Sequence, residues 1–329
     1  MTLLKHLKNE KPAHAETSAM QYPASQPDHT SIIPGHLIHT IIRPALLLIL
    51  SLFSSFSALA YDCKVDGIYY DLNNDDKTAS VTYMGLYTSD NKDAYVGNII
   101  IPESITYSGT TYSVTSIGDN AFWGCSGLTS VTIPNSVSYI GKYAFASCSG
   151  LTSVTIPNSV SYIGEAAFGG CSGLTSVTVD KNNGTYDSRD NCNAIIDTST
   201  NKLIVGCKNT TIPNSVTSSG YGAFDGCSGL TSVTIPNSVT SIGEAAFYGC
   251  SGLTSVTIPN SVTSIGKYAF EDCFWLTRLV SLAVEPPICG EGVFEEVDKT
   301  TCQLLVPEES INKYKTADQW KEFLYISGI

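Results

Sequence analysis

The sequence predicts a repeat solenoid, and three observations lead to this fold class. The unit that spans 128–150 recurs with a nearly identical sequence from Leu151, Leu230 and Leu253. Each unit carries apolar side chains that it cannot enclose alone, so equivalent coils have to stack to bury them. The divergent turn from Leu276 and a partial unit before Leu128 extend the series to about seven coils. The length of 329 residues therefore does not require several globular domains.

The amino end, residues 1–60, has the pattern of an export signal. Arg43 precedes an apolar run that reaches about Phe56 and is followed by the small-residue ending "ALA", which is typical of a cleavable secretory signal. A membrane anchor is the alternative, but a spanning helix needs about 20 apolar residues and serines interrupt this run. We expect cleavage after Ala60, no membrane insertion afterwards, and a secreted or cell-surface protein. Met20 is an alternative start.

Residues 61–112 are expected to cap the first coil. The stretch "VDGIYYDLNNDDKTASVTYMGLY" has two apolar alternations around an Asn/Asp turn, which predicts a β-hairpin. A cap is needed because a solenoid leaves an open sheet edge and an exposed core at each end.

Residues 113–282 are expected to form the solenoid itself. In the unit from Leu128, the alternation Val131-Thr132-Ile133 predicts a short parallel strand, which the following proline ends. Gly141 supplies a corner, and "KYAF" is compatible with one helical or 3₁₀ turn that returns its phenylalanine to the interior.

The regular spacing is interrupted between Leu174 and Gly229, and this segment is interpreted as one repeat that carries an insertion. The segment "NCNAIIDTSTNKLIVGC" predicts a hairpin within about 180–211, which is either a binding finger or decoration. In this unit Ser219 replaces an isoleucine and Asp180 replaces the proline. Both replacements predict a looser coil.

Residues 283–329 are expected to cap the other end. The segment "CQLLVPEESINKYKTADQWKEFLYI" predicts a strand followed by a short helix, with Trp320 and Phe323 on one face. This cap and the amino-terminal one are expected to act as lids more than as binding sites.

The pattern L-x-x-V-x-I-P-x-S-V-x-x-I-G-x-x-A-F-x-x-C, which covers about residues 113–280, resembles the BspA-like leucine-rich repeat family, also described from treponemal surface proteins. The resemblance implies a leucine-rich repeat solenoid. It also implies a secreted or surface protein of the adhesin type, since members of that family are reported to bind extracellular matrix proteins or other bacteria.

Charge and composition argue against several other functions. The formal net charge of −12 argues against binding to nucleic acid or to anionic membranes, because both kinds of binding need a basic patch on the protein. All five histidines precede residue 61, so the exported chain has no Ser-His or Cys-His nucleophile pair. Paired carboxylates lie in expected turns or caps, and no phosphate-binding loop is present. We expect no enzyme activity, no catalytic residues, no cofactor and no metal site.

The eleven cysteines invite a disulfide or zinc interpretation. Six of them recur at the same position of successive coils, where translated copies have parallel Cβ vectors. We therefore expect these six to be buried thiols that fill space as small apolar groups: Cys125, Cys148, Cys171, Cys227, Cys250 and Cys273. The better disulfide candidates are Cys192 with Cys207 and Cys289 with Cys302.

The remaining candidate for function is the outward side of the strands, where hydroxyl side chains form two neutral rows. The predicted ligand-binding residues are Ser130, Thr132, Ser153, Thr155, Ser176, Thr178, Ser232, Thr234, Ser255 and Thr257. The simplest alternative is that threonine suits a strand and serine is soluble. An extracellular or cell-surface protein is the favoured partner and a glycan the alternative, because sugar binding would need aromatics beside the rows. A purely architectural surface protein is a further alternative.

Overall fold

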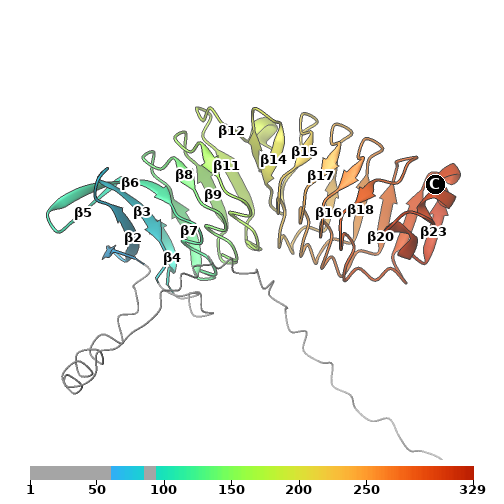
Figure 1. The fold of residues 1–329 in the computed structure, drawn as a ribbon, viewed down its shortest axis with the longest axis horizontal. Helices are drawn as coiled ribbons and strands as arrows, with labels where there is room; N and C mark the ends of the chain where they lie inside the picture. Colours follow the sequence, from blue (N-terminus) through green and yellow to red (C-terminus); the bar gives the residue numbers. More distant parts are fainter. Residues whose placement is uncertain (1–60, 85–93) are drawn as a thin grey trace, which may run out of the picture. The chain divides into compact units, whose positions relative to one another are not determined.

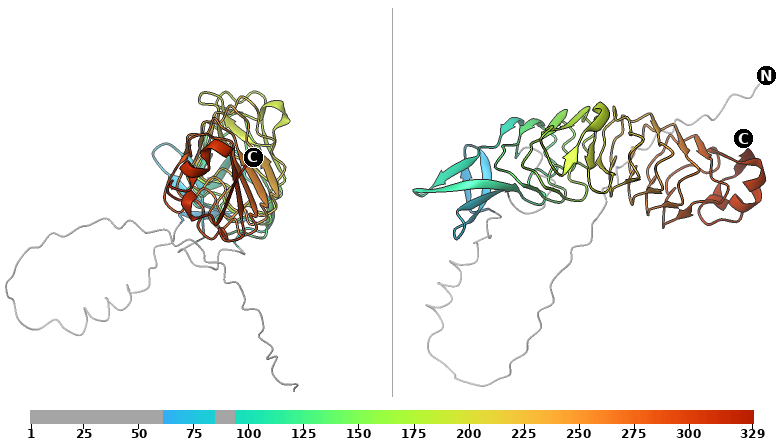
Figure 2. Two further views of the ribbon diagram at one scale, coloured as in Figure 1. Left: turned by 90° about the vertical axis from the view of Figure 1, so that its right-hand side faces the viewer. Right: turned by 90° about the horizontal axis from the view of Figure 1, so that it is seen from above.

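The computed structural model describes residues 61–84 and 94–329; the expected export signal in residues 1–60 lies outside them. The described residues all belong to one compact unit, Ser57–Ile329. They form a solenoid of about nine turns with coils of about 23 residues. The coils follow one another in Figure 1 and lie one behind another in the left view of Figure 2. The predicted repeat solenoid is confirmed, with more turns than the seven expected.

One side of the coils carries parallel strands that form two sheets, and the outer side of these sheets is here called the strand face. Equivalent residues of successive coils pair at the repeat spacing, as Val154 does with Val177. The first sheet comprises β4 (Gly97–Ile100), β7 (Leu128–Thr132), β9 (Ser153–Ile156) and β11 (Ser176–Val179). The second comprises β16 (Ser232–Thr234), β18 (Ser255–Ile258), β20 (Arg278–Ser281), β22 (Gln303–Val306) and β23 (Tyr325–Gly328).

Short strands on another side of each coil, after the proline turn, form two further sheets. The first contains β6 (Thr110–Ile117), β8 (Tyr139–Ile140) and β10 (Tyr162–Ile163). The second contains β12 (Tyr186–Asp187), β13 (Ile195–Asp197), β14 (Lys202–Val205), β15 (Ser218–Ser219), β17 (Ser241–Ile242), β19 (Ser264–Ile265) and β21 (Ile288–Cys289). Each coil is thus closed around its apolar side chains by two sheets and a return segment.

The core consists of columns of equivalent apolar residues, because each coil buries its side chains against the copies above and below. The phenylalanines show this most clearly: Phe145 stacks on Phe122 at a ring-centroid distance of 4.9 Å, and Phe247 stacks on Phe224 at 5.0 Å. All of these rings are buried. The stacking distance is close to the strand spacing of parallel sheets, so every coil repeats the same contacts.

The return segment, "KYAF" and its equivalents, does not form the expected helical turn. It forms consecutive tight turns, in which Tyr143 takes a positive φ of 54°. Its amides bond across coils, as Phe145 N–H does to the carbonyl of Ala167 at 2.7 Å. This ladder uses N–H groups that an isolated helical turn would leave unpaired. Within 61–84 and 94–329, helical segments occur only in η2 (Arg189–Asn191) and in the carboxyl-terminal cap.

The repeated cysteines are buried, as predicted, and each is also a hydrogen-bond donor. Cys148 Sγ donates to the carbonyl of Phe122 at 3.0 Å, and Cys171 Sγ donates to that of Phe145 at 3.1 Å. Burial raises the pKa of Cys171 to about 12, so the thiol stays protonated. From Cys148 onward, these cysteines therefore bond to a carbonyl of the preceding coil as well as filling space, whereas Cys125 donates to the carbonyl of Trp123 in its own coil.

The two disulfide candidates are wrong in this structure, where all eleven cysteines are free thiols. The expected hairpin forms, but its register shifts at a β-bulge, so that Ile195 pairs with Val205 and Ile196 with Leu203. Cys192 therefore does not lie opposite Cys207, whose Sγ accepts from Asn193 Nδ2 at 3.2 Å. The other pair is separated because Cys289 ends β21, while Cys302 precedes β22 in a different sheet.

Both predicted caps are confirmed. At the amino end, β1 (Cys63–Val65), β2 (Ile68–Asn73) and β3 (Thr78–Thr82) form an antiparallel meander that adds to β6, as does β5 (Ser104–Tyr107). At the carboxyl end, η3 (Glu308–Ser310), α2 (Ile311–Tyr314) and η4 (Trp320–Glu322) lie between β22 and β23. Trp320 and Phe323 are buried and contact Phe294, the last ring of the stack. They close the core at that end.

The segment from Leu174 to Gly229 forms two coils, where the sequence suggested one coil and an insertion. The first, here called the long coil, consists of residues 174–209. It contains β12 and the β13–β14 hairpin in addition to β11, and β14 pairs in parallel with β15 of the next coil. The second, the short coil, is residues 210–229. Thr210 N–H bonds to the carbonyl of Cys207 at 3.0 Å, as Leu230 N–H bonds to that of Cys227 at 2.9 Å. Thr210 therefore takes the leucine position of the repeat.

Candidate binding surface on the strand face

The ten predicted ligand-binding residues lie on the strand face in the expected rows. The sheet registers that show this are Ser130 with Ser153, Ser153 with Ser176, Thr155 with Thr178, Ser232 with Ser255, and Thr234 with Thr257, while Thr132 lies opposite Ile100. The geometry expected from the repeat is therefore present. The role of these residues in binding stays a prediction.

Every residue of the threonine row is exposed: Thr132, Thr155, Thr178, Thr234 and Thr257. Neighbouring hydroxyls bond to each other, since Thr155 Oγ1 and Thr178 Oγ1 are 3.0 Å apart. In the serine row, Ser130 Oγ donates to Asn98 Oδ1 at 2.8 Å. Hydroxyls both donate and accept hydrogen bonds but carry no charge near neutral pH. The rows can therefore bind a polar partner but offer no acid, base or activated nucleophile.

The serine row continues into more varied residues near the carboxyl end. Ser255 pairs in register with Arg278, Arg278 with Gln303, and Gln303 with Tyr325. Arg278 and Tyr325 are exposed. Sequence reasoning missed these residues, although continuing the repeat frame past Leu276 would have placed Arg278 beside Ser255. They give this end of the strand face a cation and an aromatic ring.

Exposed aromatics lie mainly away from the rows. Tyr139 and Tyr162 stack at a centroid distance of 4.7 Å, but they belong to β8 and β10, outside the strand face. Phe274 and Trp275, which are 52% and 68% exposed, lie in the corner before β20. The row residues of the regular coils thus have no aromatic partner among their sheet neighbours, apart from Tyr325 at the end.

The strand face is interrupted at the short coil. Only one residue separates Thr210 from Ile212, whereas four separate Leu230 from Ile235 in the regular coil that follows. The three missing residues correspond to the Ser-Val-Thr of the repeat. The first sheet therefore ends at β11 and the second begins at β16, with no strand from the short coil between them. The hydroxyl rows are split into two parts as a result.

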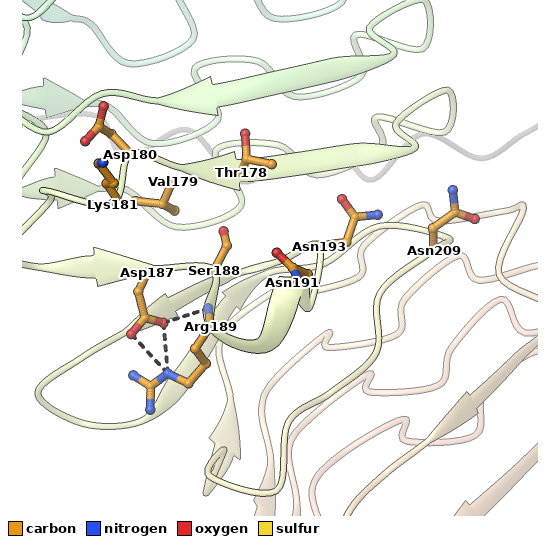
Figure 3. A pocket seen from close by; sticks show the side chains of 10 residues that line it. All are labelled: Thr178, Val179, Asp180, Lys181, Asp187, Ser188, Arg189, Asn191, Asn193 and Asn209. Carbon is orange, nitrogen blue, oxygen red and sulfur yellow. Dashed lines mark hydrogen bonds and ion pairs between the residues drawn. The ribbon is translucent and has the colours of Figure 1, made fainter.

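A polar hollow of about 610 Å³ lies at this interruption. Figure 3 shows Thr178 on one side, Ser188 on the other, and three asparagines toward one end. Its lining residues are Thr178, Val179, Asp180, Lys181, Asp187, Ser188, Arg189, Asn191, Asn193 and Asn209. Nine of these ten side chains are polar or charged, and Val179 is the exception. Sequence reasoning did not find this hollow, because it arises from residues that are missing.

Several side chains of the hollow are held in place by hydrogen bonds. Arg189 Nε donates to Asp187 Oδ1 at 2.9 Å, and this contact raises the pKa of the guanidinium. Its Nη1 donates to Asn201 Oδ1 at 2.7 Å. Asn193 Nδ2 donates to the carbonyl of Thr175 at 2.7 Å. The wall opposite β11 is therefore preorganised, and its charges are balanced.

Two carboxyl groups on the return side have altered acidity. Burial raises the pKa of Asp225 to about 7. Burial, and then repulsion from Glu295, raises the pKa of Glu271 to about 7. Asp225 lies at the interruption, where the long coil has only a short return segment and Gly170 N–H bonds directly to the carbonyl of Asp225 at 2.8 Å. Neither group adjoins a hydroxyl row or the polar hollow.

In the part of the chain that the structure describes, no three metal-ligating side chains gather in one place. The return-side carboxyl groups and the buried thiols therefore form no metal-binding set there.

The repeat region matches a known protein family. The sequence profile described as "BspA type Leucine rich repeat region" matches residues 98–204 and 195–312, with six copies of the repeat. These ranges cover more than half of the chain. The chain belongs to the BspA-type leucine-rich repeat family. The family resemblance expected from the repeat pattern is thereby confirmed.

Several solved structures are similar to this BspA-type chain. A leucine-rich cell surface protein from Faecalibacterium prausnitzii is 22% identical, with a TM-score of 0.39, and the match covers 84% of this chain and 96% of that one. A leucine-rich repeat protein from Eubacterium ventriosum is 20% identical, with a TM-score of 0.43 and coverages of 80% and 83%. The pneumococcal vaccine antigen PcpA is 16% identical, with a TM-score of 0.41 and coverages of 82% and 99%. No curated protein matched the chain.

Among the described residues of this BspA-type chain, no helix has the length and apolar character needed to cross a membrane.

Proposed function

We propose that this leucine-rich repeat protein is secreted or displayed at the cell surface and mediates adhesion by binding an extracellular or cell-surface protein, without catalysis or a cofactor. The observation that carries the proposal is the strand face, where exposed hydroxyls of successive coils lie in register. The export pattern of residues 1–60 supports the location.

A protein partner fits this surface better than a glycan. Regularly spaced, uncharged donors and acceptors complement the polar groups of another protein over a broad area. Sugar rings, by contrast, gain much of their affinity by stacking on aromatic faces, and the rows lack such rings in the regular coils. Arg278 and Tyr325 extend the surface with residue types that are enriched at protein interfaces. A glycan-binding module and an architectural surface protein are the alternatives.

The proposal is tested by measuring binding of the full-length chain to immobilised extracellular matrix proteins and to a glycan array. A triple variant, Thr155→Lys, Thr234→Lys and Thr257→Lys, places charges on exposed row positions of three coils. We expect it to lose most of the matrix-protein binding. The matched control changes Asn158, Asn237 and Asn260 to lysine; these residues are exposed in the proline turns of the same coils. Binding to glycans alone, or equal binding by both triple variants, would contradict the proposal.

A further inference from the structure

The edge of β11 at the polar hollow has backbone groups that no strand pairs. Even-numbered residues of β11 bond to β9, as shown by Ser176 N–H and Asp180 N–H, which donate to the carbonyls of Thr152 and Ile156. Hydrogen-bonding direction alternates along a strand, so Val177 and Val179 present their N–H and C=O groups to the opposite side. In the regular coils the next strand pairs with these groups. Here the short coil lacks that strand.

Asparagine side chains substitute for part of the missing strand. Asn193 Oδ1 accepts from Val177 N–H at 2.7 Å, while Asn193 Nδ2 and Asn209 Nδ2 donate to the carbonyl of Thr175 at 2.7 and 3.1 Å. The amide of Asn193 thus acts as one peptide unit of a neighbouring strand. Within 61–84 and 94–329, no group bonds to the carbonyl of Val177 or to the N–H of Val179 on this side. These two groups face the hollow.

The hollow is large enough to hold the strand that is absent. A residue in a sheet occupies roughly 160 Å³, from a rise of about 3.3 Å, a strand spacing of about 4.8 Å and a layer thickness of about 10 Å. Three residues therefore need about 480 Å³, and the hollow measures about 610 Å³. Val179 is partly exposed here, although Ile156 and Ile258 are buried at the equivalent position. An added strand would cover it.

We propose that the hollow binds a short extended peptide segment of the partner protein, which adds to the edge of β11 as a parallel strand. Its backbone pairs with the carbonyl of Val177 and the N–H of Val179, in the way that the Ser-Val-Thr of a regular coil pairs with the preceding coil. An apolar side chain of the peptide covers Val179, and small polar side chains face the hydroxyl rows. This inference rests on the proposed function and assigns to it a specific site and mode of recognition.

The charge of the hollow favours a peptide of low net charge. Asp187 and Arg189 neutralise each other through the bonds at 2.9 and 3.0 Å, and the remaining lining is mostly hydroxyl and amide. Asp180 and Lys181 add one charge of each sign, so the lining as a whole is neutral and a strongly charged segment would find no net counter-charge there. A strand of serine, threonine and valine, like those of the repeat itself, can bond to the unpaired backbone groups of β11 and matches the uncharged polar lining of the site.

The inference is tested with a displayed library of linear nine-residue peptides, selected on the full-length chain and then measured for affinity as synthetic peptides. Val179→Pro removes the edge N–H and leaves the bonds to β9 intact, since that N–H is not used there. We expect this variant to bind the selected peptides about tenfold more weakly. Val179→Thr keeps the N–H and alters only the side chain, so it is the matched control and should lose less affinity than Val179→Pro.

Two further measurements test the backbone pairing. Insertion of Ser-Val-Thr between Thr211 and Ile212 supplies the missing strand from the chain itself and is expected to abolish peptide binding. N-methylation of the peptide is expected to abolish binding at the one residue whose N–H bonds to the carbonyl of Val177 and to be tolerated at the residues on either side of it. The inference is overturned if no peptide prefers the wild type over Val179→Pro, if the insertion variant binds unchanged, or if N-methylation has the same effect at every position. If matrix-protein binding depends on the threonine row but not on Val179, the proposed function stands and the peptide site fails.

Discussion

The regular coil from Leu253 and the short coil from Thr210 have nearly the same sequence, "IPNSVTSIG" and "IPNSVTSSG", after the strand position. The regular coil places Ser255, Val256 and Thr257 in β18, paired on both sides, whereas the short coil has no strand there. The loss of three residues leaves the turn, β15 and the buried phenylalanine Phe224 in place. The comparison shows that each side of a coil is specified separately, so that one side can open into a hollow while the others continue.

The interior also differs between the two regions. In the regular coils the phenylalanine stack is continuous, whereas at the interruption Gly206 takes the phenylalanine position: its N–H bonds to the carbonyl of Ala223 at 2.7 Å, as Phe224 N–H bonds to that of Ala246. The apolar core correspondingly separates into two clusters, with Cys207 in one and Cys192 in the other. Local stability should therefore be lower at the interruption.

The largest expected effect comes from the continuous stack. Phe247 is stacked on both sides, at 5.0 Å from Phe224 and 5.1 Å from Phe270, whereas Phe168 stacks, within the described residues, only on Phe145. We expect Phe247→Ala to lower the free energy of unfolding by about 3–5 kcal/mol, because it leaves a cavity between two rings. Phe168→Ala should cost less. Urea denaturation of both variants measures the difference, and an equal cost would show that the interruption does not weaken the core.

The next effect concerns the glycine that replaces a phenylalanine. A Cβ at Gly206 would overlap the ring of Phe224. Gly206→Ala should therefore lower the free energy of unfolding by about 1–3 kcal/mol, as expected for overpacking. Gly184→Ala in the same long coil is the matched control, because nothing lies within 4 Å of its Cβ position. Equal stability of the two variants in urea denaturation would mean that the coils separate easily at the interruption.

The third effect is a pH dependence at the interruption. Burial raises the pKa of Asp225 to about 7 in the folded chain, above the value of about 3.9 expected in the unfolded chain. The folded state therefore binds more protons between these values, and the free energy of unfolding falls as pH rises from about 4 to about 7. Asp225→Asn removes this dependence. We expect the variant to match the wild type near pH 4 and to exceed it by at least about 1 kcal/mol at pH 8.

Asp298→Asn provides a control of opposite sign for this pH series. Hydrogen bonds from Thr300 and Thr301 lower the pKa of Asp298. Its contribution to stability is present above the unfolded pKa and is lost as pH falls through the folded one. The variant should therefore be less stable than the wild type at pH 7 and similar to it in strong acid. Parallel pH curves for Asp225→Asn and the wild type would contradict the burial of the Asp225 carboxylate.

The smallest expected effect is a gain in stability. A void of about 10 Å³ adjoins Ser219, which replaces the buried isoleucine of the regular coils. Its Oγ accepts from Gly243 N–H at 2.8 Å, whereas in the regular coils that N–H bonds to the isoleucine carbonyl, as Gly266 N–H does to Ile242. Ser219→Ile should fill the void and restore the regular bond, and thereby raise stability by up to about 1 kcal/mol. Ser219→Ala, which removes the hydroxyl without filling the void, should not be stabilising. Thermal denaturation compares the two.

The looser packing expected at Ser219 is consistent with this void, and it was predictable because the repeat supplies an internal reference for each position. The rows of the strand face were predictable for the same reason, since residues one repeat apart have to lie side by side once the coils stack. The free thiols of Cys192 and Cys207 were not predictable. The register shifts between Ile195 and Ile196, with Ile204 as the extra residue of β14, so that different side chains face each other, and no sequence signal marked this shift.

The sequence by itself determined the solenoid, the strand face and the two caps, because apolar residues that recur at a fixed spacing can be buried only by stacking. Only the tertiary structure decided where the repeat opens. The segment between Leu174 and Gly229 divides into a long and a short coil because β14 takes the place of a regular rung and Gly206 takes that of a phenylalanine. Both features depend on contacts between residues that are far apart in the sequence. The free energy of these contacts outweighs the local preference for a regular repeat. The hollow at β11 follows from them.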